Sequence, residues 1–232
     1  MGKNVVVIGG GPAGMAAAGK LSELGQEVTL IEKDAELGGH LKKWYKVFPD
    51  FTDASEIIAE LKAGLHGTRV LNNCTVNRIE GSAPNFTVTT STGEKIEAAS
   101  ILVATGFNHF DASFKEEYGY DIYDNSITSV ELDAMLKQQT VKTASGRAPR
   151  KIAMVHCVGS RDEKVNNNYC SRVCCTNAVK VAIEVKEQIP DCEIYSAAAE
   201  IAGFLATKVG SISQFESATN GHFVSKKQVV HQ

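Results

Sequence analysis

The feature that most constrains the fold is a run of glycines between an apolar strand and a helix. Gly9-Gly10-Gly11-Pro12-Ala13-Gly14 has the pattern G-x-G-x-x-G, and it lies between the β-branched run 5–8 and a helical pattern over 15–24 that Gly25 would end. The first glycine of such a loop permits a tight turn, the second lets the backbone approach a pyrophosphate, and the third lets helix and strand pack closely. The helix N-terminus offers free N–H groups and partial positive charge to phosphates.

An acidic residue follows the second predicted strand. Residues 28–31 complete a βαβ unit of ordinary size, and Glu32 comes directly after them. A carboxylate in this place can accept hydrogen bonds from the hydroxyl groups of a ribose. A structural turn and a solvated surface carboxylate would explain the loop and Glu32 separately. Together, strand, loop, helix and acid predict a dinucleotide-binding site.

Two later motifs indicate that the dinucleotide is FAD rather than NAD. Leu37-Gly38-Gly39 follows Glu32-Lys33-Asp34, and the predicted strand 101–104 runs into Thr105-Gly106. This order resembles that of flavoproteins with two dinucleotide-binding domains, in which a Gly-Gly loop lies close to the flavin. By this analogy His40 would lie near the flavin, although a lone histidine is more often a surface or packing residue. The candidate cofactor-binding residues are Gly9, Gly11, Pro12, Ala13, Gly14, Glu32, Lys33, Gly38, Gly39, His40, Leu41, Val76, Ala104, Thr105 and Gly106.

The remaining pattern predicts an α/β protein with an FAD-binding domain over residues 1–110 and a partial second βαβ unit over 151–195. Residues 111–150 would connect them, and 196–232 would form a poorly patterned tail. In the first domain we expect a helix at 55–65, capped by Asp53 or Ser55, strands at 69–79, 86–90 and 101–104, and a turn at 91–94. Further on we expect helices at 129–138, 173–189 and, within the tail, 197–209, with strands at 151–158 and 192–195.

Composition excludes several classes of function. The 232 residues are 43% hydrophobic and 22% charged, so a core of ordinary size can form without disulfides or a structural metal. A net charge of −3 without a basic stripe argues against nucleic acid as a partner. No apolar run is long enough to span a bilayer, and residues 1–4 run into the first strand without the features of a secretory leader. We therefore expect a cytoplasmic protein with reduced cysteines.

Four of the six cysteines form a group. Cys157, Cys170, Cys174 and Cys175 have the spacing C-x12-C-x3-C-C, and four thiolates can hold zinc or an iron–sulfur cluster. Adjacent cysteines suit a tetrahedral zinc ion poorly but can bind different irons of a cubane, so the chemistry favours iron–sulfur. The group joins a strand to a helix, where an NAD-binding unit would hold its pyrophosphate, and no second glycine motif is present. The helix N-terminus would favour an anionic cluster.

The other residues near this group, and the other two cysteines, allow plainer explanations. Arg161 and Arg172 flank the site, where they either offset its negative charge or are simply solvated. Cys74 and Cys192 each stand alone in a strand-like run, and we expect both to be core residues.

Residues 156–162 (HCVGSRD) and 169–175 (YCSRVCC) resemble the A-type flavoprotein subunit of heterodisulfide reductase, and also the A-type subunit of the quinone-interacting membrane-bound oxidoreductase. The resemblance covers residues 1–195. It implies a thioredoxin-reductase-like fold, FAD, and a nearby [4Fe–4S] cluster with Cys157, Cys170, Cys174 and Cys175 as ligands. It also implies electron transfer to other iron–sulfur subunits of a reductase complex, one of which could link the protein indirectly to a membrane.

The chain departs from this family in three ways. It lacks the extra ferredoxin-type cysteine runs, it has no Gly-Asp dipeptide of the kind that contacts the flavin late in such chains, and the likeness ends after Tyr195. A truncated or frameshifted gene, or a genuine short variant, would explain the tail. Two alternatives therefore stand beside the main hypothesis. One is a pyridine-nucleotide flavin oxidoreductase with a redox-active dithiol, and the other is a non-catalytic fragment or assembly subunit.

Overall fold

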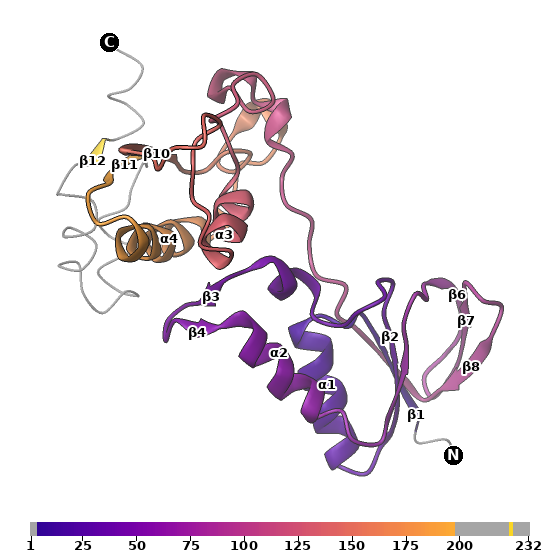
Figure 1. The fold of residues 1–232 in the computed structure, drawn as a ribbon. Coiled ribbons are helices and arrows are strands. Elements are labelled where there is room, and N and C mark those ends of the chain that lie inside the picture. Colours follow the sequence, from indigo (N-terminus) through magenta and orange to yellow (C-terminus); the bar gives the residue numbers. More distant parts are fainter. Residues whose placement is uncertain (1–3, 198–222, 225–232) are drawn as a thin grey trace. The chain divides into compact units, whose positions relative to one another are not determined.

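The chain divides into two compact units. The computed structural model describes residues 4–197 and 223–224. The first unit is formed by the described residues up to Lys43 together with Thr52–Asn108, and the second by Trp44–Phe51 together with the described residues from His109 onward (Figure 1). Between β2 and α2 the chain forms a short helical turn, η1 (Gly39–Lys43), and two very short strands, β3 (Lys46–Val47) and β4 (Thr52–Asp53).

The first unit is built on a parallel sheet whose strand order reverses at β1. The order is β5-β2-β1-β9, so the chain moves outward from β1 through β2 to β5 and later adds β9 on the other side of β1. In parallel sheets ligands bind at the carboxyl ends of strands beside such a switch point. The strands are β1 (Asn4–Ile8), β2 (Glu27–Ile31), β5 (Thr68–Leu71) and β9 (Ser100–Val103).

Different layers cover the two faces of this sheet. On one face lie α1 (Pro12–Glu23) and α2 (Ala54–Ala63), and on the other an antiparallel sheet of β6 (Val76–Ser82), β7 (Asn85–Thr90) and β8 (Lys95–Ala98) (Figure 1). Successive side chains of a strand point to opposite faces. Val7 accordingly packs with Met15 of α1, while Val6 packs with Val88 of β7.

Most predicted elements of this unit are confirmed, and the differences have local causes. Helix α1 begins at Pro12 rather than Met15, because proline needs no N–H in the first turn. Asp53 caps α2 by accepting the N–H of Ser55. The prediction of a single strand over 69–79 is wrong. This segment contains the two strands β5 and β6, because Asn73 takes a left-handed φ of 51° and breaks the extended chain. Sequence reasoning also missed β8, which follows the predicted turn at 91–94.

The second unit contains a parallel sheet in the order β10-β11-β12, with α4 joining β10 to β11 and α3 packed along α4. Its core consists of Leu132 and Leu136 of α3, Val181 and Val185 of α4, and Ile194 of β11, with neighbours of the same kind. The elements are α3 (Ser129–Lys137), β10 (Lys151–Val155), α4 (Cys174–Gln188), β11 (Glu193–Ala197) and β12 (Phe223–Val224), with short turns η2 (Ala112–Phe114), η3 (Glu116–Tyr118) and η4 (Glu163–Val165).

One strand of the second unit is shorter than predicted. The strand predicted over 151–158 ends at Val155, because Cys157 has a φ of 59° and cannot continue the pleat. The helix predicted over 197–209 lies outside the described residues except for Ala197, which ends β11. Cys74 and Cys192 are buried in the apolar clusters of the two units, as predicted.

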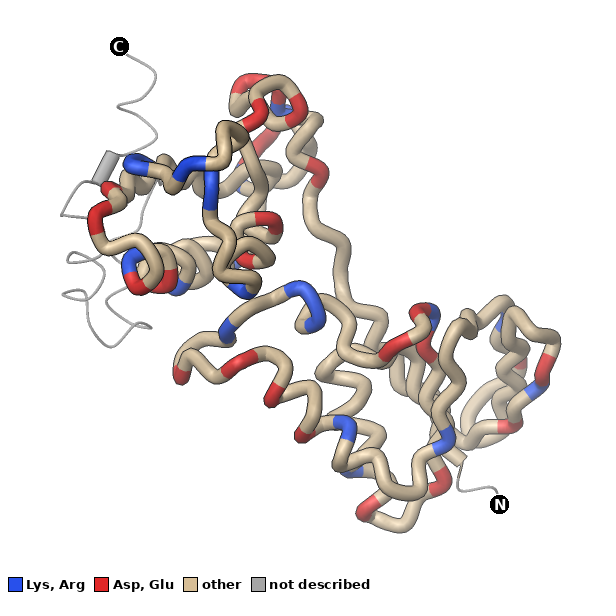
Figure 2. Tube along the Cα trace, viewed as in Figure 1, with Lys and Arg blue, Asp and Glu red and all other residues tan. Residues whose placement is uncertain are grey.

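Charge is mixed in sign over both units, and Figure 2 shows basic and acidic residues interspersed along the described chain. Among the described residues there is no helix with the length and apolar character needed to cross a bilayer.

A buried charge network links α3 to α4. Lys180 of α4 forms ion pairs with Asp133 and, at 3.3 Å, with Glu184, and it also donates to the backbone oxygen of Lys46. Asp133 in turn accepts the N–H of Tyr45. Apart from its ion pair with Lys180, neither carboxylate oxygen of Glu184 has a hydrogen-bond partner among the described residues. Burial therefore raises the pKa of Glu184 to about 7, although the positive charge of Lys180 acts to lower it.

This pKa makes the stability of the second unit depend on pH. A carboxyl group whose pKa is higher in the folded state binds more protons there, so stability falls as pH rises from the unfolded value of about 4.5 through 7. We expect Glu184→Gln, which does not titrate, to be more stable than the wild type by up to about 3 kcal/mol at pH 8 and by much less at pH 4. Urea unfolding across this range measures the difference.

The matched control is Glu187→Gln, which removes an exposed carboxylate of the same helix that pairs with Lys46. Its stability relative to wild type should change little over the same pH range. An E184Q difference that does not grow with pH would contradict the prediction.

Candidate functional site

The glycine loop after β1 has a geometry that two of its glycines make possible. Gly9 has a φ of +109°, which side chains of L-residues rarely allow. A Cβ on Gly14 would lie 1.8 Å from the carbonyl oxygen of Gly9. Helix α1 can therefore start close against the end of β1 only because Gly14 has no side chain.

Gly11 differs from its neighbours because a Cβ there would meet no atom within 4 Å. It is the N-cap of α1 with an ordinary φ of −72°, and no side chain caps the helix. The first turn also carries no acidic residue. Open space therefore adjoins an uncapped helix N-terminus, which is an arrangement that suits a phosphate group.

Glu32 holds the glycine loop in place. Its buried carboxylate accepts the N–H of Gly10 at 2.6 Å through one oxygen and the N–H of Asp34 at 2.8 Å through the other. The sequence pattern gave this residue a role toward a ribose, which remains a prediction. The structure adds a second role, since Glu32 ties the end of β2 to the loop that follows β1.

The Gly-Gly motif lies against the same loop. The N–H of Gly38 donates to the carbonyl of Gly10 at 2.8 Å, and a Cβ on Gly39 would come within 3.1 Å of the Cα of Gly11. Nε2 of His40 lies 2.7 Å from the carbonyl oxygen of Phe107, and the two rings are 4.9 Å apart. The segments that follow β1, β2 and β9 therefore meet at one edge of the sheet.

The other predicted cofactor residues of this unit fall into two groups. Pro12, Ala13, Lys33, Thr105 and Gly106 are exposed, and Ala104 is half-buried beside Gly14. Leu41 is buried, and Val76 packs against the apolar cluster under β6. The packing of these two side chains gives them a structural role in addition to any contact with a cofactor.

The four grouped cysteines lie on the connection from β10 into α4 in the second unit. Cys157 follows β10, Cys170 lies on the long loop, and Cys174 and Cys175 are the first two residues of α4. Cys157 is buried, Cys170 is exposed, and none of the four forms a disulfide. Val173, the N-cap residue, provides no side-chain cap to the helix.

The loop between Cys157 and Cys174 is folded back on itself by hydrogen bonds. Ser160 donates to the carbonyl of Tyr169 at 3.0 Å and accepts the N–H of Ser171 at 3.1 Å. Asp162 and Asn167 exchange two backbone hydrogen bonds of 2.8 and 3.0 Å. These contacts return the chain to the end of β10 and so bring Cys170 back toward Cys157.

A buried lysine fixes the same loop to the segment before it. Lys115, only 3% exposed, pairs with Asp162 at 2.6 Å and with Glu117 at 2.8 Å. The hydrogen bond to Asp162 raises the pKa of Lys115, so the ammonium stays charged. The weakly patterned segment after residue 110 thus supports the cysteine loop.

Left-handed backbone is concentrated in this loop. Cys157, Arg161, Asn166 and Arg172 all have φ between 53° and 63° although none is glycine. Such residues are uncommon, and they cluster where the surrounding structure holds the backbone for a functional purpose. Both arginines that flank the cysteines are among them.

The sulfur atoms act on one another electrostatically. Hydrogen bonds from the Cys157 and Cys175 thiols lower the pKa of Cys174, and the same contact with Cys174 raises the pKa of each donor. The charge of Cys170 also raises the pKa of both Cys157 and Cys175. The N–H of Arg172 also donates to Sγ of Cys170 at 3.3 Å. Soft thiol ligands that converge in this way suit a thiophilic metal centre.

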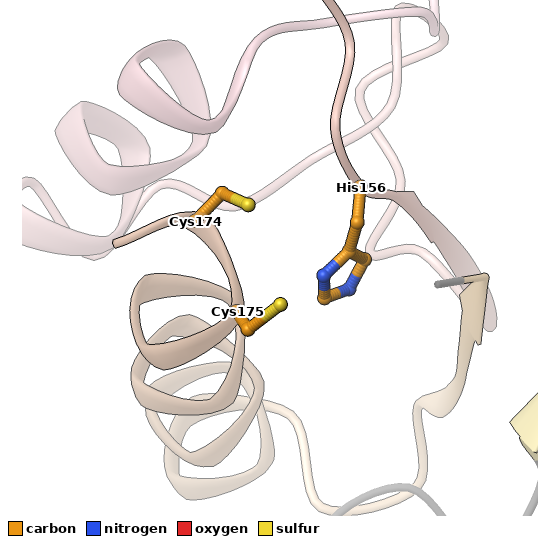
Figure 3. A group of neighbouring side chains, drawn as sticks. All are labelled: His156, Cys174 and Cys175. Carbon is orange, nitrogen blue, oxygen red and sulfur yellow. The ribbon is translucent and has the colours of Figure 1, made fainter. Parts of the chain in front are cut away.

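A fifth potential ligand, His156, joins the cysteines. One of its ring nitrogens and the Sγ atoms of Cys174 and Cys175 all lie within 4.8 Å of one another, and the ring faces the two sulfur atoms (Figure 3). The sequence patterns did not select His156 as a site residue. Its position directly before the first cysteine, just after the strand β10, is the signal that could have identified it.

Comparison with known proteins shows the family. The pyridine nucleotide-disulphide oxidoreductase family matches residues 3–155, well over half of the sequence. The chain belongs to the pyridine nucleotide-disulphide oxidoreductase family. The match ends directly before His156, so the cysteine loop lies outside the matched residues.

Relatives that also match the cysteine-bearing half are heterodisulfide reductase subunits, which confirms the resemblance found in the sequence. The A-type iron-sulfur subunit of CoB–CoM heterodisulfide reductase from Methanocaldococcus jannaschii is 27% identical, and the A-type subunit of the H2/formate:CoB–CoM heterodisulfide, ferredoxin reductase from Methanococcus maripaludis is 29% identical. Each alignment covers 87% of this chain and 44% of the relative. The chain thus spans less than half the length of these relatives.

Solved structures confirm the predicted fold. The thioredoxin reductase of T. acidophilum matches with a TM-score of 0.60 at 14% identity over 96% of this chain and 64% of its own. The thioredoxin reductase of Lactococcus lactis matches with a TM-score of 0.57 at 17% identity over 96% and 63%. The fold is therefore that of the thioredoxin reductases.

The two informative glycines of the first loop should respond differently to substitution. We expect Gly14→Ala to destabilise the protein by about 3 kcal/mol, because its methyl group meets the Gly9 carbonyl. Gly11→Ala should cost less than about 1 kcal/mol but should weaken FAD binding, because the methyl group occupies the open space beside the helix N-terminus. Urea unfolding and FAD titration measure the two effects. Wild-type FAD affinity in G11A would show that the dinucleotide does not use this space.

Ser160 should determine how often the cysteine loop opens. Ser160→Ala removes the two hydrogen bonds that the Ser160 hydroxyl forms across the loop. We expect faster trypsin cleavage after Arg161, Lys164 or Arg172 in the metal-free protein, followed by mass spectrometry, since cleavage tracks the population of the open loop. Ser113→Ala, which removes a hydroxyl from an exposed turn, is the control and should cleave at the wild-type rate. Equal rates for the two variants would contradict the role given to Ser160.

Proposed function

We propose that this chain is an electron-transfer flavoprotein with one [4Fe–4S] cluster that acts within a heterodisulfide-reductase-like complex. The observation that carries the proposal is a group of four free thiols on the connection into the uncapped N-terminus of α4, with Cys174 in contact with Cys157 and Cys175, in a member of this oxidoreductase family. The names of the relatives, which describe iron-sulfur and ferredoxin reductase subunits, support the same chemistry.

The first unit would bind FAD. The space beside Gly11 and the N-terminus of α1 would receive the pyrophosphate, and Glu32 would approach a ribose while it holds the loop through Gly10. Gly38 and Gly39 would let the chain run close to the isoalloxazine end. Bound FAD would supply the exchange of a hydride or of single electrons.

The second unit would hold the cluster. Cys157, Cys170, Cys174 and Cys175 would each bind one iron, so the thiols that now hydrogen-bond to one another would become thiolate ligands. The N-terminus of α4 and the N–H of Arg172 toward Cys170 would stabilise the negative charge. Such a cluster carries one electron at a time to a further centre.

The further centre would lie in a partner. The relatives are named as A-type subunits of reductases, which supports a partner for this chain. We propose other iron–sulfur subunits as partners, with membrane association, if any, through one of them. Basic and acidic residues are interspersed along the described chain, which does not support nucleic acid as a partner (Figure 2).

Anaerobic reconstitution followed by metal analysis tests the proposal. We expect about four irons and one FAD per chain, an absorption band of the cluster, and an EPR signal after reduction. Cys175→Ala should lower the iron content to well below four. The matched control is Cys74→Ala, which changes a cysteine buried in the core of the first unit, and it should keep the wild-type iron content. A reconstituted wild type without iron would refute the cluster.

A redox dithiol is the second candidate function. It is favoured by the free thiols of Cys157 and Cys174, which act on one another so that the pKa of Cys174 is lowered, as in attacking thiols. This function predicts an iron-free protein that gains a disulfide on mild oxidation and releases two thiols on reduction. Thiol titration beside the iron measurement separates the two functions. A chain that retains neither FAD nor iron would instead be a non-catalytic fragment or assembly subunit.

A further inference from the structure

His156 is a buried histidine with one ring nitrogen bonded and the other without a partner. The side chain is 5% exposed, and its Nε2 lies 2.8 Å from Oγ of Ser196 on the neighbouring strand β11. Its Nδ1 is buried and has no hydrogen-bond partner among the described residues. A buried nitrogen in this state costs free energy unless something else satisfies it.

The unsatisfied nitrogen faces the cysteines. Figure 3 shows Nδ1 on the side of the ring toward the sulfur atoms of Cys174 and Cys175. A ring nitrogen of His156 and these two sulfur atoms all lie within 4.8 Å of one another. The other nitrogen points the opposite way, toward β11. The ring is therefore held from behind by Ser196 and presents Nδ1 to the sulfur site.

We propose that Nδ1–H of His156 donates a hydrogen bond to a sulfur atom of the cluster held by Cys157, Cys170, Cys174 and Cys175, and that Ser196 fixes the tautomer that makes this possible. This inference rests on the proposed function. With Oγ–H of Ser196 donating to Nε2, the ring proton is on Nδ1. An N–H group facing thiolate sulfur is satisfied, whereas a lone pair in the same place would face negative charge.

The ligand count supports a donor rather than a ligand. Four cysteines already supply one thiolate to each iron of a cubane, which leaves the histidine as an additional group. Hydrogen bonds to sulfur stabilise the reduced, more negative state of a cluster and raise its reduction potential. His156 would thus set the potential at which this chain accepts an electron, and Ser196 would act through it as a positioning residue.

The test compares three variants of the reconstituted full chain by EPR-monitored redox titration. We expect His156→Leu to keep four irons but to lower the reduction equilibrium constant at least tenfold, which is 59 mV for a one-electron couple. His156→Asn, whose amide N–H reaches a similar place, should stay within about threefold of wild type. Ser196→Ala should shift the potential in the same direction as H156L but by less.

Spin-echo spectroscopy of the reduced cluster in protein labelled with nitrogen-15 histidine provides the second readout. A weak coupling that disappears in H156N supports the hydrogen bond, and a strong coupling typical of a ligand would overturn it. Unchanged potentials in both H156L and S196A would also overturn it while leaving the proposed cluster intact. A wild type that takes up no iron would instead overturn the proposed function, and this inference with it. If H156L loses its iron, the reduction potentials of H156N and S196A still test whether His156 donates to the cluster.

Discussion

Both candidate sites depend on one constraint, which is how a chain leaves a parallel strand and begins a helix whose N-terminus is uncapped. In the first unit the turn is short, and the helix starts so close to the strand that a Cβ on Gly14 would meet the Gly9 carbonyl at 1.8 Å. The absence of side chains keeps the space beside Gly11 open to a ligand. An N–H-rich helix end beside open space is what an anion requires.

In the second unit the chain makes the same kind of connection from strand to helix, but with a different structure. Its connection from β10 to α4 is long, and side chains close it rather than glycines. Ser160 joins the two sides of the loop, and Lys115 fixes it through Asp162. The helix N-terminus then receives sulfur atoms from the protein itself in place of open space. The same strand-to-helix arrangement therefore underlies both candidate sites, the glycine loop of the first unit and the cysteine group of the second.

Buried polar groups differ between the units in how they are satisfied, and the difference indicates their roles. Glu32 accepts two backbone N–H groups, so its burial stabilises the glycine loop. Glu184 has no such partner, and its raised pKa makes it a source of pH-dependent instability. Nδ1 of His156 is unsatisfied as well, but it faces sulfur atoms rather than a packed helix. An unsatisfied group at the edge of a ligand site points to the ligand.

The sequence by itself determined the features that depend on single residue types and short spacings. Glycine has no Cβ and cysteine has a thiol wherever they occur, so the loop at 9–14 and the four-cysteine group could be recognised without a structure. The family, the fold and most helices and strands followed from the same local patterns.

Only the tertiary structure decided the features that depend on partners distant in sequence. The break at Asn73 separates two strands, the role of Glu32 depends on Gly10, and the orientation of His156 depends on Ser196, which is 40 residues away in sequence. Burial and hydrogen-bond satisfaction are properties of the folded neighbourhood. No spacing in the chain encodes them, and for that reason the group most directly aimed at the cysteines was the one that the sequence patterns passed over.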